Sequence, residues 1–224
     1  MEKRLQQTAD GSHTIFVPEL NEHYHSVNGA IEESRHVFIR AGFEHCVKPG
    51  EKINLLEVGF GTGLNALLTC IAAQKTNVQV NYVGIEAYPL PDEIINALNY
   101  PQATDELQAE LLFKKIHDAN WVYPSYITER FLLNKIEAML QDVSLSAGMF
   151  NLIYFDAFSP EVQPELWTDD ILRKLYAALA ADGILVTYSS KGTVKQALRK
   201  AGFTIERLRG AAGKRHMLRA IKNV

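Results

Sequence analysis

Cysteine is scarce in this sequence of 224 residues, which contains only Cys46 and Cys70. Two cysteines provide neither the disulfide framework of a small secreted protein nor a four-cysteine zinc site. Of the seven histidines, only His23 and His25 lie close together, and such a pair is too isolated to support a metal. We therefore expect reduced cysteines that serve in packing, and no bound metal.

Long hydrophobic runs are also missing. No apolar stretch approaches the roughly 18 residues needed to cross a bilayer, and residues 1–7 lack the apolar core of a signal peptide. Hydrophobic residues make up 47% of the chain and charged residues 22%, a balance typical of a soluble globular protein. The length suits one domain over residues 1–224. We expect a cytoplasmic protein with no membrane partner.

Acidic residues are almost absent from the carboxyl-terminal segment. From Lys191 onward, Glu206 is the single acid against ten basic residues, so this segment carries a charge of +9. Because the whole chain carries −3, the remainder carries −12. A segregated positive segment is typical of a surface that binds a polyanion such as nucleic acid. The alternative is a solvated basic face without a partner.

Strand and helix patterns alternate through the rest of the chain. Short apolar runs typical of buried strands cover residues 53–58, 80–85, 151–155 and 184–188. Apolar residues at helical spacing cover residues 64–74, 168–181 and 192–201. Thr168 is a suitable N-cap for the second of these helices. The alternation predicts a mainly parallel α/β sheet.

The chain ends in two further strand patterns, residues 204–208 and 216–221. The glycine-containing segment between them is too short to hold a crossover helix, so the two strands are predicted to be antiparallel. A mostly parallel sheet that finishes in such a hairpin is the Rossmann-like arrangement of class I methyltransferases that use S-adenosyl-L-methionine (AdoMet). We expect an N-terminal extension over residues 1–50, with a hairpin through residues 13–17, and a helical insertion over residues 90–127.

A glycine-rich turn connects the first of these strands to its helix, with the sequence Glu57-Val58-Gly59-Phe60-Gly61-Thr62-Gly63. A dinucleotide-binding turn requires a glycine where Leu64 stands, which argues against NAD and FAD. An acid followed by three alternating glycines is the methyltransferase form, in which backbone approaches the amino-acid part of AdoMet. Glu86, 29 residues after Glu57 at the end of the next strand, suits the ribose hydroxyls. An ordinary turn is the alternative.

The residues predicted to bind the cofactor are Glu57, Gly59, Phe60, Gly61, Thr62, Gly63, Asn65, Glu86, Asn134, Asp156 and Ala157. Asn134 is included because it follows the apolar run 131–133, where a polar group near the adenine is expected.

Asp156-Ala157-Phe158-Ser159-Pro160 follows the strand pattern 151–155 at its carboxyl end. Methyl transfer to an amine requires a neutral nitrogen held about 3 Å from the methyl group, with its lone pair aimed. Asp156 is the predicted catalytic residue because a carboxylate can hold the amine hydrogens. Phe158 is expected to lie against a planar base, and Pro160 to stiffen the loop. The alternative makes Asp156 an acid that only caps a loop.

These motifs together resemble the methyltransferase half of the MnmC family, bifunctional enzymes that complete methylaminomethyl-2-thiouridine at the tRNA wobble position. The resemblance runs from about residue 24 to residue 220 and rests on residues 37–39, 57–63, 156–160, 164–167, 188–190, 201–203 and 213–218. It implies AdoMet-dependent methylation of the exocyclic amine of 5-aminomethyl-2-thiouridine, with Asp156 next to the acceptor. It also implies two partners, tRNA and a separate chain with the FAD-dependent oxidoreductase activity.

The residues predicted to bind the substrate are Tyr24, Ser26, Glu33, Phe158, Ser159, Pro160, Lys214 and Arg215. Lys214 and Arg215 are assigned to tRNA phosphates, whereas a solvated helix start is the alternative for Glu33. Two other functions stay open, namely AdoMet-dependent methylation of a small-molecule or protein amine, and a non-catalytic tRNA-binding partner of an FAD oxidoreductase. Glu86 and Asp156 together disfavour the second, because a binding module needs neither.

Overall fold

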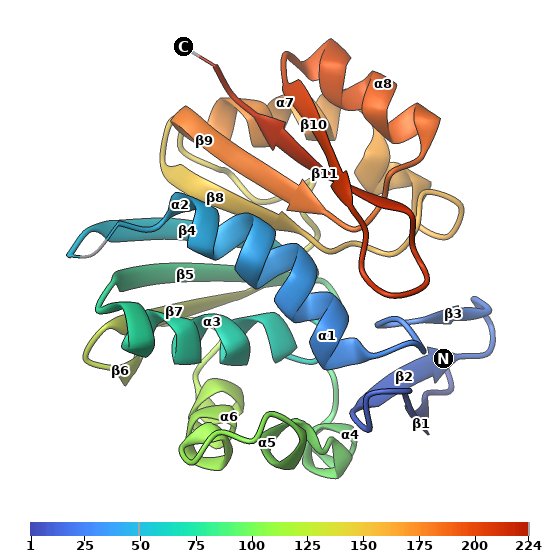
Figure 1. Cartoon of the computed structure of the whole chain (residues 1–224), viewed down its shortest axis with the longest axis vertical. Coiled ribbons are helices and arrows are strands. Elements are labelled where there is room, and N and C mark those ends of the chain that lie inside the picture. The colour runs from blue at the N-terminus through green and yellow to red at the C-terminus, as the bar shows by residue number, and fades with distance from the viewer. Residues whose placement is uncertain (49, 224) are drawn as a thin grey trace.

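The computed structural model describes residues 1–48 and 50–223, which form two β-sheets and the helices around them (Figure 1). Pro49 and Val224, which belong to the predicted extension and the predicted domain, lie outside the described residues. Among the described residues, no helix is both long and apolar enough to cross a membrane. Cys46 and Cys70 are free thiols.

The larger sheet has eight strands in the order β10-β11-β9-β8-β4-β5-β7-β6. Its strands are β4 (Lys52–Val58), β5 (Gln79–Glu86), β6 (Ser125–Thr128), β7 (Phe131–Glu137), β8 (Phe150–Phe155), β9 (Leu179–Thr187), β10 (Thr204–Arg209) and β11 (His216–Ile221). The five central strands are parallel, and β10 and β11 form an antiparallel pair. This confirms the predicted α/β sheet with its antiparallel carboxyl-terminal hairpin.

The helices cover both faces of this sheet. They are α1 (Ala30–Ser34), the π-helix η1 (Arg35–Phe43), α2 (Glu44–Cys46), α3 (Leu64–Thr76), α4 (Asp92–Ala97), α5 (Tyr100–Ala103), α6 (Ala109–Asp118), the 3₁₀ helix η2 (Pro164–Trp167), α7 (Asp169–Ala178) and α8 (Gly192–Ala201). Side chains of η1, α3 and α6 form one core, whereas α7 and α8 contribute to a second core on the opposite face.

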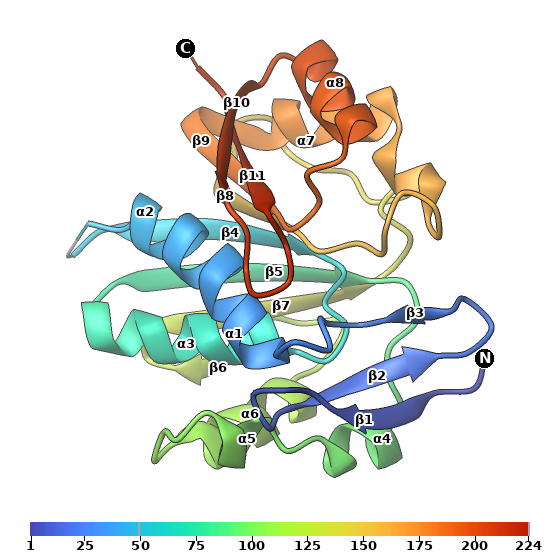
Figure 2. The ribbon, with the colours of Figure 1, turned by 45° about the vertical axis from the view of Figure 1, so that its right-hand side comes forward.

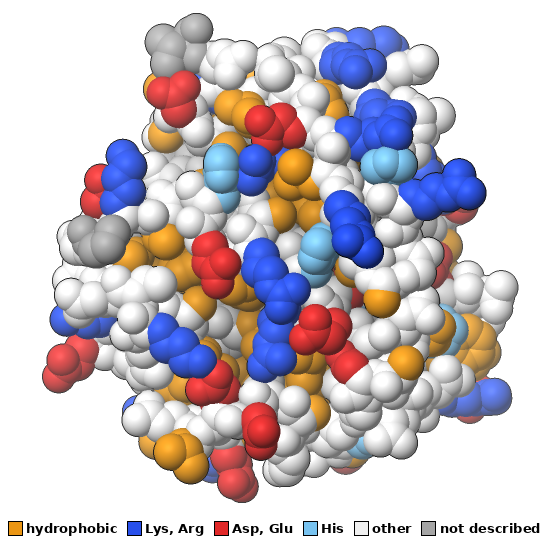
Figure 3. Space-filling view, viewed as in Figure 1, with side chains coloured by type: hydrophobic (Ala, Val, Ile, Leu, Met, Phe, Trp, Pro, Cys, Tyr) orange, Lys and Arg blue, Asp and Glu red, His pale blue; other side chains and the backbone are white. Residues whose placement is uncertain are grey.

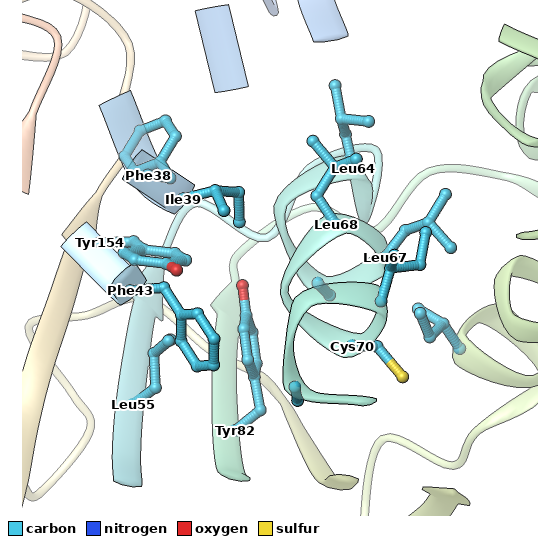
Figure 4. Packing of buried hydrophobic residues seen from close by; sticks show 14 of the residues in the cluster. Phe38, Ile39, Phe43, Leu55, Leu64, Leu67, Leu68, Cys70, Tyr82 and Tyr154 are labelled. Carbon is cyan, nitrogen blue, oxygen red and sulfur yellow. The ribbon is translucent and has the colours of Figure 1, made fainter. Parts of the chain in front are cut away.

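Alternation along the strands explains why there are two cores. Leu55 points into the first core and Leu56 into the second, and both are fully buried. Figure 4 shows the first core, where Phe43 of η1 lies beside Tyr82 of β5, and Phe38 of η1 packs near Tyr154 of β8. A sheet buried on both faces requires the near-continuous apolar strands that the sequence contains.

Two predicted element boundaries were wrong. Helix α7 begins as predicted, with Thr168 Oγ1 accepting a hydrogen bond from the Ile171 amide, but it ends at Ala178 instead of residue 181. Leu179 begins β9 because it pairs with Phe150 on β8. The insertion 90–127 is helical only as far as Asp118, since β6 pairs with β7 and buries Ile127 between more exposed neighbours.

A separate three-stranded antiparallel sheet contains β1 (Arg4–Gln7), β2 (His13–Val17) and β3 (Glu22–His23). The pairing of β1 with β2 confirms the predicted hairpin through residues 13–17. Figure 2 shows this small sheet beyond the carboxyl ends of the parallel strands. It therefore covers the edge at which the glycine turn, Glu86 and Asp156 emerge.

Candidate active site

A cavity of about 410 Å³ opens at the carboxyl ends of β4, β5 and β8. Its floor includes the glycine turn, Glu86 and Asp156, and residues of the N-terminal sheet line the opposite side. The carboxyl ends of parallel strands at a crossover are the usual position of a ligand site in this type of sheet. The cavity thus contains the glycine turn, Glu86 and Asp156, to which the sequence analysis assigned cofactor binding and catalysis.

The glycine turn needs its glycines. Gly59, Gly61 and Gly63 have φ values of 86°, 50° and 71°, in the left-handed region that favours glycine. A Cβ atom on Gly59 would lie 2.6 Å from the carbonyl oxygen of Asp156. The turn therefore runs against the strand that bears Asp156 and presents bare backbone to the cavity.

Glu86 is fixed at the carboxyl end of β5 by two backbone donors. Its carboxylate accepts hydrogen bonds from the Gly61 amide and from the Tyr88 amide, each 2.9 Å long. One carboxylate thus links the glycine turn to the segment after β5. A partly buried acid held in this way is suited to accept hydrogen bonds from a pair of hydroxyl groups, as the acid of nucleotide-binding sheets does for ribose.

Asp156 lies directly after β8, where its backbone amide donates to the carbonyl oxygen of Val58 over 3.0 Å. Its Oδ2 accepts a hydrogen bond from the Asn65 side-chain amide over 2.8 Å. Burial raises the pKa of Asp156 to about 7, and the negative charge of Glu33 contributes to the increase. The Asn65 hydrogen bond and the charge of Lys214 act in the opposite direction. Asp156 therefore exchanges a proton near neutral pH, which suits a general base.

Glu57 lies behind the cavity and supports Asp156 through Asn65. Its fully buried carboxylate accepts hydrogen bonds from Asn65 over 2.8 Å and from the Tyr82 hydroxyl over 2.7 Å. Burial raises the pKa of Glu57 well above its ordinary value. The Asn65 carbonyl accepts from the Ser34 hydroxyl, so all polar atoms of this amide are used. The predicted cofactor residues Glu57 and Asn65 thus form a buried network that orients Asp156.

The acceptor side of the cavity contains an ion pair. Lys214 Nζ lies 2.6 Å from Glu33 Oε1 and 4.1 Å from the centroid of the Tyr188 ring. The other Glu33 oxygen accepts from the Ser26 amide over 2.8 Å. The Glu33 side chain is only 8% exposed, so Lys214 supplies the charge that balances it. The structure places Lys214 in the cavity wall, and its predicted contact with a tRNA phosphate stays a prediction.

Aromatic side chains form the rest of this wall. The Tyr24 and Phe158 rings meet edge to face with centroids 5.1 Å apart. The Tyr188 hydroxyl donates to the carbonyl oxygen of Ala157 over 3.0 Å, and the indole of Trp167 donates to that of Phe158 over 2.8 Å. These contacts hold the loop after Asp156 rigid, so that the aromatic faces stay in place for a planar ligand.

The structure brings most of the predicted residues to the cavity. In the described part of the chain its lining includes Tyr24, Ser26, Glu33, Gly59, Phe60, Gly61, Thr62, Asn65, Glu86, Asp156, Ala157, Phe158 and Lys214. Outside the lining lie Glu57, Gly63, Asn134, Ser159, Pro160 and Arg215. Phe60 also packs its ring against Trp121 and His117, so its side chain belongs to the core.

Asn134 does not line the cavity as predicted, because its strand extends further than the sequence analysis expected. β7 continues to Glu137, and Asn134 pairs with Val83 in mid-strand instead of standing at the carboxyl end. Leu140 and Gln141, which follow this strand, line the cavity in its place. In the fold, Phe131, Leu133 and Lys135 are buried in alternation, but the charge of Lys135 hides this alternation in the sequence.

His25 and Tyr188 also line the cavity, although neither is among the residues predicted to bind the cofactor or the substrate. Burial lowers the pKa of His25 to about 4, so its imidazole is neutral at physiological pH. Its ring nitrogens lie 3.4 Å from the Tyr100 hydroxyl and 3.5 Å from that of Thr62. Their proximity cannot be predicted from local sequence, because the N-terminal extension and the end of β9 meet only in the folded chain.

Comparison with known proteins gives consistent matches. Residues 100–223 match the family described as S-adenosyl-L-methionine-dependent methyltransferase. The chain is 32% identical, over 88% of its length, to the "tRNA 5-methylaminomethyl-2-thiouridine biosynthesis bifunctional protein MnmC" of Azoarcus sp. (strain BH72). It is 28% identical to the protein of the same name from Magnetococcus marinus over 93% of its length. The chain spans about a third, 32%, of the length of each relative.

The chain is also similar over its whole length to solved structures. The crystal structure of MNMC2 from Aquifex aeolicus superposes with a TM-score of 0.79 at 26% identity, over 100% of this chain and 71% of that one. Spermidine synthase from Thermotoga maritima superposes with a TM-score of 0.56 at 15% identity, over 100% of this chain and 73% of the other. The second match concerns the fold alone.

Proposed function

The chain belongs to the family of S-adenosyl-L-methionine-dependent methyltransferases, and we propose that it methylates the exocyclic amine of 5-aminomethyl-2-thiouridine at the tRNA wobble position. The observation that carries this proposal is Asp156, a carboxylate with a pKa near 7 that faces a cavity between a bare glycine turn and an aromatic wall. The names of the relatives, which are tRNA modification proteins, support the choice of substrate.

The residues present fit AdoMet. Gly59 and Gly61 line the cavity with backbone alone, and Glu86 stands beside them with a carboxylate suited to ribose hydroxyls. We assign the ribose to Glu86, the amino-acid part to the turn, and the adenine to the segment that contains Leu140 and Gln141. When bound, AdoMet supplies a methyl group on a positively charged sulfur.

Asp156 prepares the acceptor. A primary aliphatic amine resembles the lysine side chain, whose ordinary pKa of about 10.4 keeps it protonated at neutral pH and without a lone pair. An ionised Asp156 accepts hydrogen bonds from the amine, takes up a proton from it and orients the nitrogen toward the cofactor side of the cavity. Once that proton has passed to solvent, the ionised carboxylate stabilises the positive charge that develops on the nitrogen as the new bond forms.

The aromatic side chains of the cavity wall suit an acceptor with a planar ring. Phe158 and Tyr24 line the cavity next to Asp156, and the contacts of the loop with Trp167 and Tyr188 hold them in place. A base that is turned out of an RNA strand is commonly held by stacking on such rings. We assign Phe158 to the uracil ring and Glu33 and Lys214 to its polar edge.

The precursor amine requires a separate reaction. In the proposed function the amine is supplied by an FAD-dependent oxidoreductase acting in the cytoplasm on the same tRNA. The relatives, which are described as bifunctional and are about three times the length of the region matched, support such a partner.

The test is methyl transfer by the purified chain. Bulk tRNA from a strain that lacks this gene is incubated with AdoMet, digested to nucleosides and analysed by mass spectrometry. We expect the loss of 5-aminomethyl-2-thiouridine and the appearance of its singly methylated product. Transfer to small amines or proteins but not to this tRNA would favour the first alternative, and binding of tRNA without any transfer would favour the second.

A further inference from the structure

The structure divides the ten basic residues of the carboxyl-terminal segment into two groups. Four of them have acidic partners, in the ion pairs Lys191–Glu161, Lys200–Asp169, Lys214–Glu33 and Arg219–Glu206. Lys222 donates to the carbonyl oxygen of Leu179. Among the residues that the structure describes, the other five form no ion pair, and they are Lys195, Arg199, Arg207, Arg209 and Arg215. The excess charge is therefore concentrated on this second group.

Three of these five residues gather around His216, the first residue of β11. Arg207 lies on the neighbouring strand β10, and its guanidinium is 2.9 Å from the Nε2 atom of His216. A guanidinium can only donate, so this nitrogen is an acceptor and the imidazole is neutral. Burial lowers the pKa of His216, and the positive charges of Arg207, Lys195 and Arg215 lower it further.

An arginine that donates to an imidazole, with two more cations nearby, lacks a counter-charge. Arg207 and Arg215 are exposed, so solvent reaches the cluster. Figure 3 shows blue side chains gathered over the part of the surface where Figure 1 places α8, β10 and β11. Mutual repulsion of unpaired cations costs stability, and an anion bound between them removes that cost.

The cluster lies at the same edge of the sheet as the cavity. Arg215 follows Lys214, which lines the cavity, and β11 pairs with the end of β9 directly before Tyr188, another lining residue. A polymer with one nucleotide in the cavity therefore has its backbone within reach of the cluster. Phosphates spaced along a strand provide the negative charges that three neighbouring cations require.

We propose that Lys195, Arg207 and Arg215 form a binding site for backbone phosphates of the RNA that carries the acceptor nucleotide. This inference rests on the proposed function for the identity of the polymer. The site holds and orients the RNA through its phosphates, and the cavity selects the base. Arg215 thereby keeps the role predicted from the sequence, whereas Lys214 belongs to the cavity.

The test compares the salt dependence of RNA binding in the wild-type full chain, in a variant of the proposed site and in a control variant. The first variant carries Lys195→Gln, Arg207→Gln and Arg215→Gln. The control carries Lys52→Gln and Arg130→Gln, two exposed cations at the amino ends of β4 and β7 on the opposite edge. Binding of bulk tRNA from the strain lacking this gene is measured by fluorescence anisotropy between about 50 and 200 mM salt.

Removal of one cation that neutralises a phosphate should flatten the log-log slope by about 0.7 to 0.9 and weaken binding about five- to eightfold at 0.1 M salt. We expect the triple variant to show two or three times this change in slope, with unchanged AdoMet affinity and a melting temperature no lower than that of the wild type, and the control to keep the wild-type slope. A triple variant with the wild-type slope overturns the site.

The methyl-transfer assay separates this result from the proposed function. If the wild type transfers methyl groups to tRNA while the triple variant keeps the wild-type slope, the phosphate site fails and the function stands. If the wild type transfers none but the triple variant alone flattens the slope, the phosphate site stands and the function fails.

Discussion

The side-chain amide of Asn65 donates a hydrogen bond to Asp156 over 2.8 Å, from the first turn of α3 to the end of β8. The same nitrogen donates its second hydrogen to Glu57, also over 2.8 Å. Asn65 therefore holds one carboxylate oxygen of Asp156, a residue that lines the cavity. This relationship makes Asn65 a positioning residue for the acceptor carboxylate.

Replacing Asn65 should change the pH profile more than cofactor binding. Asn65→Ala removes a hydrogen bond that lowers the pKa of Asp156, so the pKa rises and the single-turnover rate reaches its plateau at higher pH. Asn65→Asp places a third carboxylate beside Glu57 and Asp156 and should move the profile further. Rates are measured from pH 6 to 9, with AdoMet affinity from calorimetry as the control. Profiles identical to the wild type would contradict the positioning role.

Asp156 itself should control methyl transfer near neutral pH. Its carboxylate is the active form, and because the folded pKa is about 7, the wild-type rate should rise as the pH increases through that value. Asp156→Asn keeps the shape but cannot take up a proton, so the rate should fall about a hundredfold or more and lose this inflection. Single-turnover assays at saturating AdoMet measure both effects. Near wild-type rates in Asp156→Ala would mean that another residue holds the amine.

Substitution of Glu86 should weaken AdoMet binding without slowing methyl transfer at saturating AdoMet. Glu86→Ala removes a charged acceptor, and hydrogen bonds to charged groups contribute about 1.5 to 3 kcal/mol, so AdoMet should bind about ten- to a hundredfold more weakly. Calorimetry provides the dissociation constant. At saturating AdoMet the single-turnover rate should recover. An unchanged dissociation constant would remove Glu86 from the cofactor site.

Gly59 should tolerate no side chain. In Gly59→Ala the new Cβ meets the Asp156 carbonyl at 2.6 Å, so the turn must move away from β8. We expect a lower melting temperature together with loss of AdoMet binding. Gly148→Ala is the matched control, because Gly148 also has a positive φ, of 66°, but among the described residues nothing beyond its chain neighbours lies within 4 Å of the position its methyl group would take. Equal effects in both variants would show that backbone strain, not the close approach, is responsible.

Lys214 should affect chemistry and leave the salt dependence of RNA binding unchanged. Lys214→Met leaves the charge of Glu33 unbalanced, and because Lys214 lowers the pKa of Asp156, the midpoint of the pH profile should move to higher pH. Lys214→Arg keeps the positive charge and should restore the midpoint. Arg215→Gln should do the reverse, flattening the salt slope by about 0.7 to 0.9 without moving the midpoint. A flattened slope in Lys214→Met would return Lys214 to the phosphate surface.

The sequence by itself determined the parts of the site that depend on short segments. Three alternating glycines after an apolar strand require a left-handed turn, and an acid at the end of the next strand must emerge at the same edge of a parallel sheet. Glu86 and Asp156 therefore reach the cavity that the sequence implied. The hairpin β10–β11 is equally local, because the short connection between its strands leaves no other pairing.

Only the tertiary structure decided how distant segments meet. The N-terminal sheet lines the cavity, Asn65 bonds to Asp156 across 91 residues, and Lys214 pairs with Glu33 across 181. Local patterns also failed to predict the end of the strand that contains Asn134 and the end of α7. In both cases pairing with a strand remote in sequence set the boundary. The physical reason is that burial and hydrogen bonding are satisfied over the whole molecule, so a lysine that looks like a surface cation in sequence balances a buried carboxylate in the fold.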